Sequence, residues 1–180
     1  MDSSPRTYRF LPADVYTSGY RIVGKIMVST HGTMGIMNDN TKSYVEIHDA
    51  RLARIHMPTK LVDHFEVVRL IKSQVIAVCA ARREDLGPTG MQRSGYSSIS
   101  VLPARLTTEV YELEGKLEVG GRFDFSVMIA DKGRNFIPLY EAVLTAILIH
   151  NLKVECPAIL FNREKVELLA LLGQRVKEEK

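Results

Sequence analysis

One nine-residue pattern occurs twice in the chain and constrains the fold more than any other feature. Residues 20–28 read YRIVGKIMV and residues 111–119 read YELEGKLEV, with Tyr, Gly, Lys and Val at matching places. Apolar residues fall at alternate positions in both patterns, which is typical of a β-strand with one buried face. The sequence therefore predicts a tandem duplication of a small β-rich unit.

The similarity continues on both sides of this strand at an offset of 91 or 92 residues. LPA occurs at 11–13 and at 102–104, and YVEIHDARL at 44–52 shares its apolar positions with FIPLYEAVL at 136–144. Further on, VVRLIKSQVIAV aligns with AILFNREKVELL. These matches predict the following division of the chain: repeat 1 at residues 8–81, a linker at 82–98, repeat 2 at 99–173 and a tail at 174–180.

Each copy is expected to hold four to five strands and one short helix. The helix should follow the first strand, because Phe123, Val127 and Ala130 recur at near-helical spacing. Strands are expected next, and then a hairpin that closes each copy. The predicted strands are 44–55 and 136–149, and the predicted hairpin turns are 72–74 and 162–165. The helix-forming composition of the last segment is overridden by the repeat, which predicts strand to about residue 171.

Four residues are predicted to shape the two equivalent strands. Gly24 and Gly115 lie in mid-strand, where glycine permits a bulge, a bend or a close backbone approach. Tyr20 and Tyr111 begin the apolar alternation. The predicted fold is therefore mainly β, with two tandem, similar, small β-barrel-like or strongly bent sheets and short helices.

Composition places the chain among ordinary globular proteins. It has 180 residues, 46% of them hydrophobic and 25% charged, with a net charge of +3. That charge is too small to indicate a nucleic-acid groove. No long apolar run and no signal-peptide pattern is present, so we expect a cytoplasmic protein outside the membrane. Cys79 and Cys156 are expected to be buried free thiols, since a reducing cytoplasm disfavours disulfides.

The familiar signatures of catalysis and cofactor binding are missing from the sequence. It contains no GxxxxGK[ST], no GxGxxG after a strand and no GxSxG. No cysteine or serine can be assigned to a histidine base. We therefore expect no catalytic residue, no cofactor-binding residue and no cofactor, and we do not favour an enzyme.

Three histidines could converge on a metal ion. His48, His56 and His64 are spaced eight residues apart, with aspartates beside two of them. The spacing is not that of a known ligand motif, and repeat 2 has Tyr140 in the place of His48. We interpret the three as strand and loop histidines and expect no metal site.

Basic residues cluster in repeat 1 and are the weak candidates for nucleic-acid binding. They are Arg51, Arg54, Lys60, Arg69 and Lys72. A β platform for RNA or single-stranded DNA interleaves such residues with exposed aromatics. Tyr44 and Phe65 are near them in sequence but fall on the apolar parity, which favours core packing instead.

Repeat 2 resembles a family of small bacterial β-rich domains of unknown function. The resemblance rests on YELEGKLEV, GRFDF, FIPLYEAVL and ILFNREKVELLAL at residues 111–171, and more loosely on residues 20–80. Repeat 1 departs from it by having HGTMG for GRFDF and Ile71 for Asn162. The family implies no activity to carry over. Strand count and curvature also resemble Sm-like small barrels, an analogy of fold alone.

The sequence favours a non-enzymatic binding or assembly module. The alternative is a protein that binds a small ligand, RNA or single-stranded DNA at the seam between the repeats. Val23 and Met27 stand where repeat 2 has Glu114 and Glu118, so this strand of repeat 1 is apolar on both faces. We expect repeat 2 or a second chain to cover it, which predicts a homo-oligomer, with another protein as the other partner class.

Overall fold

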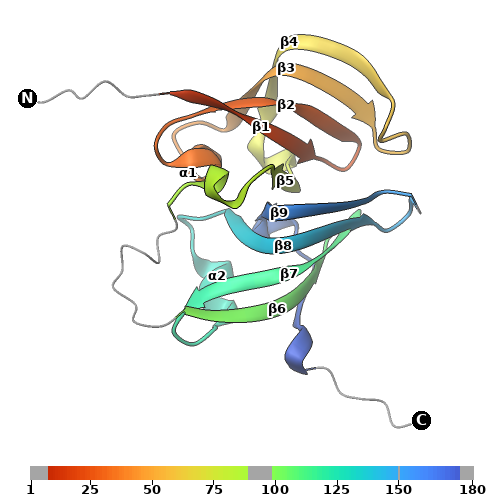
Figure 1. The fold of residues 1–180 in the computed structure, drawn as a ribbon. Helices are drawn as coiled ribbons and strands as arrows, with labels where there is room; N and C mark the ends of the chain where they lie inside the picture. Colours follow the sequence, from red (N-terminus) through yellow and green to blue (C-terminus); the bar gives the residue numbers. More distant parts are fainter. Residues whose placement is uncertain (1–7, 89–98, 150, 175–180) are drawn as a thin grey trace, which may run out of the picture.

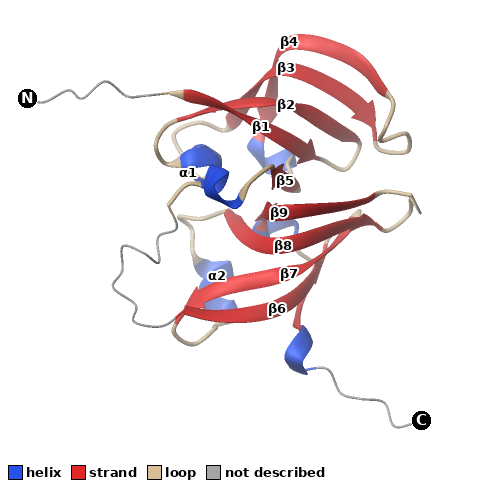
Figure 2. Cartoon of the chain, in the orientation of Figure 1, coloured by secondary structure: helices blue, strands red, loops and turns tan. Residues whose placement is uncertain are grey.

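The ten strands in the described part of the chain form one continuous antiparallel sheet (Figure 1; Figure 2). The computed structural model describes residues 8–88, 99–149 and 151–174. The strands of the N-terminal half are β1 Arg9–Tyr16, β2 Tyr20–Val28, β3 Tyr44–Arg54, β4 Leu61–Ile71 and β5 Ala77–Ala80. Those of the C-terminal half are β6 Ile99–Thr107, β7 Tyr111–Gly120, β8 Phe136–Ala146, β9 Lys153–Asn162 and β10 Leu168–Leu171.

The two halves place their strands in the same order. The whole sheet runs β10-β6-β7-β8-β9-β5-β1-β2-β3-β4. The first five strands of this order belong to the C-terminal half and the last five to the N-terminal half. In each half, the final short strand pairs with the first, and the fourth strand lies at the opposite edge. The halves meet where β9 pairs with β5 (Figure 1).

This arrangement corrects two expectations from the sequence. We expected two separate small barrels or bent sheets, whereas the described strands form one sheet that does not close into a barrel. The predicted closing hairpins are also wrong. A 3₁₀ helix, η1 Lys72–Gln74 or η4 Arg163–Lys165, separates the two strands of each expected pair. These turns send β5 to β1 and β10 to β6, on the far side of each half.

The short helices lie where the sequence predicted them. They are α1 Gly32–Met37 and α2 Phe125–Ala130, each between the second and third strand of its half. The last segment is a strand to Leu171, as expected, and is followed by η5 Leu172–Gln174. No helix in the described part of the chain is long and apolar enough to cross a membrane.

The expected linker begins with ordered structure. Residues 83–86 form the 3₁₀ helix η2, Arg83–Leu86, and the Leu86 side chain is fully buried. Gly87, at φ +89, passes so close to the backbone of His31 that a Cβ would lie 2.1 Å from its carbonyl oxygen. This segment therefore packs onto the N-terminal half. The remainder of the expected linker, residues 89–98, is outside the described residues.

The mid-strand glycines lie opposite a bulge in each half. The register of β2 with β3 shifts between Val23 and Lys25, and that of β7 with β8 shifts between Glu114 and Lys116. The residue inserted in the partner strand has positive φ in both cases, 50° at Asp49 and 46° at Glu141. A Cβ on Gly24 or Gly115 would lie 2.8 Å from a backbone oxygen of the partner strand. Glycine is therefore required at both positions, because any side chain would collide with backbone.

The two tyrosines differ in their surroundings. Tyr111 is fully buried, whereas Tyr20 is 43% exposed, against our expectation that both lie on a covered face. The Tyr111 hydroxyl contacts the Thr17 carbonyl of the other half, whereas Tyr20 begins β2 opposite Arg54 of β3. The rest of the alternation is confirmed, since Ile22, Ile26 and Val28 are buried.

Candidate assembly interface

The junction between the halves is a short antiparallel pairing of two strands. Ala77, Val78, Cys79 and Ala80 of β5 lie opposite Phe161, Leu160, Ile159 and Ala158 of β9. Hydrogen bonds extend the pairing by one step, because the Asn162 amide N–H donates to the Ile76 carbonyl at 2.9 Å. The sheet therefore passes from one half into the other without an edge.

Both faces of this junction are covered by apolar side chains. Val78 and Leu160 belong to a core with Phe136 and Leu86, and Cys79 and Ile159 belong to a second core that includes Tyr111. Every residue of β5 is buried. Each core thus contains residues of both halves, and the N-terminal and C-terminal halves are packed as one body.

Side-chain hydrogen bonds to backbone hold the two halves in register. The Asn162 Nδ2 donates to the Val75 carbonyl at 2.9 Å, and the Tyr111 hydroxyl donates to the Thr17 carbonyl at 2.8 Å. Asn38, after α1, donates to the Phe136 carbonyl and accepts from its N–H, at 2.9 and 2.8 Å. These bonds satisfy backbone groups at the ends of strands, where the ladder stops.

The Arg83 side chain, in η2, makes a further contact between the two halves. The Arg83 guanidinium donates to both carboxylate oxygens of Glu118 at 2.7 and 2.6 Å, and lies 3.9 Å from the centroid of the Tyr140 ring. The hydrogen bonds to Glu118 raise the pKa of Arg83. Burial raises the pKa of Tyr140 above its usual value. This contact links the N-terminal half to strands β7 and β8 of the C-terminal half.

A polar cluster lies under the junction on the side of the second core. The Arg21 guanidinium donates to Asp14 at 2.7 Å, and the Tyr16 hydroxyl donates to the same carboxylate at 3.0 Å. Cys79 and Cys156 are both free and buried, as the sequence predicted. Their side chains are hydrogen-bonded to each other, which raises the pKa of Cys79 and lowers that of Cys156. Each side chain of this cluster has a hydrogen-bonding partner within the cluster.

The outer edges of the sheet contrast with the junction. Within residues 8–88, 99–149 and 151–174, no strand pairs with the outer side of β4 or of β10. Apolar side chains are exposed along both, including Val62, Phe65 and Ile71 on β4 and Leu168 on β10. Met27, which we expected to be covered, is 41% exposed, and Val23 is half-buried. Open strands with apolar side chains are prone to pair with another chain.

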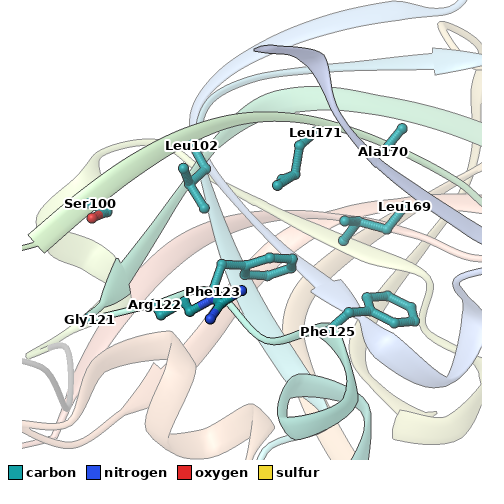
Figure 3. Close-up of a pocket in the computed structure, with 9 residues that line it drawn as sticks. All are labelled: Ser100, Leu102, Gly121, Arg122, Phe123, Phe125, Leu169, Ala170 and Leu171. Atoms are coloured by element: carbon teal, nitrogen blue, oxygen red, sulfur yellow. The ribbon is translucent and has the colours of Figure 1, made fainter. Parts of the chain in front are cut away.

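An apolar groove of about 730 Å³ lies beside β10 (Figure 3). Phe123, Leu169 and Leu171 surround it, together with Leu102 of β6. Helix α2, at one end of the groove, buries none of its residues. In the N-terminal half the corresponding space is filled, since Leu86 packs with Val78, Ala80 and Leu11 in one core.

Two smaller hollows open along the seam between the halves. One, of about 190 Å³, is lined by polar residues of both halves, including Lys42, Lys72, Asn135 and Glu164. The other, of about 300 Å³, lies between the turn at Ser18 and the segment after η4. Both offer room for a small polar ligand between the halves.

Four of the five candidate nucleic-acid residues are exposed, and the fifth is buried. Arg51, Arg54, Lys60 and Arg69 are exposed on or next to β3 and β4, and Arg69 donates to Glu46 at 3.0 Å. Lys72 is buried, and its Nζ donates to the Asp39 carbonyl at 2.7 Å. Burial lowers the pKa of Lys72. Of the two aromatics near them, Phe65 is exposed and Tyr44 is half-buried.

The three histidines do not converge. His64 is hydrogen-bonded to Asp49 at 2.7 Å, which lowers the pKa of that carboxyl, and His56 is exposed in the turn after β3. His48 packs edge-on against Phe10, at a centroid distance of 5.0 Å. In the described residues, no group of three or more His, Cys, Asp or Glu side chains is placed to hold a metal ion.

Two of the residues that fasten the junction, Asn38 and Arg83, were not singled out by the sequence. Each contacts a strand of the other half, and no local pattern identifies such a contact. One signal was available for β5, since residues 75–80 are all apolar. A run without alternation is typical of a strand buried on both faces, hence of a strand with neighbours on both sides.

The chain matches no protein-family model, no curated protein and no solved structure. A candidate function therefore has to come from the geometry of the sheet and its edges.

Proposed function

We propose that this protein is a non-enzymatic assembly module, whose two halves are copies of one β unit and which joins further chains at the edges of its sheet. The pairing of β5 with β9 carries this proposal. It joins the last strand of one half to the fourth strand of the other. The same two kinds of strand, β10 and β4, are left open at the ends of the sheet.

The equivalence of the halves is supported by features that strand order alone does not require. The glycine opposite the bulge, the positive φ of the inserted residue and the 3₁₀ turn after the fourth strand occur once in each half. These features lie at the offset of 91 or 92 residues seen in the sequence. When a second unit of this kind pairs with the edge strand of the first, that edge strand becomes buried.

Self-association can be tested by light scattering across a concentration series. We expect an average mass above the 20.3 kDa of one chain at micromolar concentration, rising toward a multiple of it. Val67→Asp on β4 and Leu171→Asp on β10 should each return the mass toward a single chain, because they place a charge on a half-buried edge position. A constant mass of one chain at all concentrations would refute the proposal.

The matched control is Leu148→Asp. Leu148 is 82% exposed in the turn between β8 and β9, away from both open strands. This variant should associate as the parent does, and unfolding midpoints should show that all three variants remain folded. Equal loss of association in the control would mean that net charge, not the edge, is responsible.

A second candidate function is small-ligand binding at the seam. The observation that favours it is the hollow where Lys42 and Ser73 of the N-terminal half meet Asn135 and Asn162 of the C-terminal half. RNA or single-stranded DNA would use the same place through its phosphates. Titration with a short oligonucleotide, compared between the parent and Lys42→Ala, tests this candidate without reference to the sheet edges.

A further inference from the structure

Building on the proposed function, we propose that the second chain joins head to tail: β10 of one chain pairs antiparallel with β4 of the next, in the register that the internal junction uses. The pairing of β5 with β9 inside the chain has the geometry that we propose for this contact. There, the four residues of β5 lie opposite residues 158–161 of β9.

The register follows from the equivalent positions of the strands. The fourth strand of each half ends directly before its 3₁₀ turn, at Ile71 in β4 and at Asn162 in β9. Residues 67–70 of β4 therefore correspond to residues 158–161 of β9. The expected opposite pairs are Leu168 with Leu70, Leu169 with Arg69, Ala170 with Val68 and Leu171 with Val67.

The distribution of charge along the fourth strands is consistent with this register. In β9, charged residues precede the junction, where Lys153 and Glu155 form an exposed ion pair at 3.7 Å. In β4, Asp63, His64 and Glu66 likewise precede residues 67–70. Only Arg69 falls within the expected contact. Charges on an open strand discourage pairing where they lie, so pairing is favoured over the apolar end.

The helix and groove beside β10 also fit this partner. At the internal junction, α1 lies against the start of β8, through the two hydrogen bonds of Asn38 with Phe136. Helix α2 has the same place in its own half, and its Phe125, Val127 and Ile129 are exposed. With a second chain on β10, α2 would lie against the start of that chain's β3. The apolar groove beside β10 would then be covered by β3 and β4 of the second chain.

Tyr20 is placed to make the same contact with a second chain that Tyr111 makes inside the chain. Tyr111 is buried at the junction because its hydroxyl reaches the Thr17 carbonyl of the other half. Tyr20 and Thr108 are the equivalent residues at the open ends, and Thr108 follows β6 as Thr17 follows β1. Head-to-tail pairing would bring the Tyr20 hydroxyl to the Thr108 carbonyl of the neighbouring chain. A pairing of two β4 strands would not.

Disulfide trapping between two different variants, each with one cysteine added to the two native ones, tests the register. One chain carries Val68→Cys and the other Ala170→Cys, the counterparts of the facing pair Ile159 and Cys79. Facing antiparallel residues are close enough for a disulfide. Oxidised glutathione takes up the two electrons and leaves as two thiols. We expect a covalent dimer of the two variants in the mixture, and much less from either variant alone.

Two controls distinguish a wrong register from an absence of self-association. Glu66→Cys with Ala170→Cys is two residues out of register and should give at least several-fold less covalent dimer. Light scattering on the same samples separates the two proposals. A single-chain mass would refute self-association, whereas an oligomer that yields no mixed dimer, or that links Val68→Cys to itself, would overturn the head-to-tail register and leave self-association standing.

Discussion

Strands β5 and β10 have the same length and the same place in their halves, yet their surroundings differ completely. β5 lies between β1 and β9 and is buried throughout, whereas β10 pairs with β6 alone and leaves Leu168 and Ala170 exposed. The difference arises because β9 pairs with the outer side of β5, whereas no described strand pairs with the outer side of β10. The two strands therefore compare a covered edge with an open one.

The largest expected difference between junction and edge concerns Phe161 and its counterpart on β4, Leu70. Phe161 is fully buried between the halves, so Phe161→Ala should lower the free energy of unfolding by about 3–5 kcal/mol. Leu70 is only half-buried at the open edge, and Leu70→Ala should cost less than half as much. Urea unfolding of dilute protein measures both. Equal losses would mean that β4 is as well covered as β9.

The bulge glycines should respond alike, because they have the same surroundings in both halves. Gly24→Ala and Gly115→Ala place a Cβ within 2.8 Å of backbone oxygen, and each should destabilise by about 1–3 kcal/mol. Gly19→Ala is the control, since no atom lies within 4 Å of a Cβ there. If thermal melts of either bulge variant match the parent, the halves do not share this requirement.

Variants of Tyr111 and Tyr20 should distinguish an effect on folding from an effect on self-association. Tyr111→Phe removes a buried hydrogen bond to Thr17, at an expected cost of about 1–2 kcal/mol in unfolding free energy. Tyr20→Phe should leave the unfolding of the isolated chain unchanged and weaken self-association instead. The two variants are compared by chemical unfolding at low concentration and by light scattering at high concentration. Identical effects on both measurements would contradict the assigned difference.

The smallest expected effect is at the inserted bulge residues. Glu141 has a left-handed backbone conformation, which asparagine adopts more readily than glutamate. Glu141→Asn should therefore stabilise the fold by up to about 1 kcal/mol, less any contribution of the exposed ion pair with Lys116. Asp49→Asn starts from a residue already suited to this conformation and should change stability less. A larger gain at Asp49 would contradict this ranking.

Local sequence pattern predicted the elements well and their partners poorly. The alternation in residues 20–28 and the short helices were predictable because each depends on neighbouring residues. The strand at 168–171 was predictable only from its match to residues 77–80, since its own composition favours a helix. Pairing was not, because consecutive strands usually form hairpins and the 3₁₀ turns at Lys72 and Arg163 redirect the chain. The proximity of Cys79 and Cys156 depends on two halves meeting, which neither half encodes alone.

The candidate interface was predictable only in outline. The replacement of Glu114 and Glu118 by Val23 and Met27 predicted that this face of the N-terminal half is covered, whereas Met27 is 41% exposed. The sequence could not identify the edge, since the exposure of Phe65 and Leu168 depends on which strands pair. The sequence also predicted a homo-oligomer without identifying which edges would join.

Hydrogen–deuterium exchange at low and high protein concentration tests the central claim most directly, because it reads the backbone of all four strands at once. We predict slow exchange in β5 and β9 at every concentration. In residues 67–70 and 168–171, the amides that do not donate to β3 or β6 should exchange fast in dilute protein and become slow together as concentration rises. Protection of β4 without β10, or of neither in an associated sample, would contradict head-to-tail assembly.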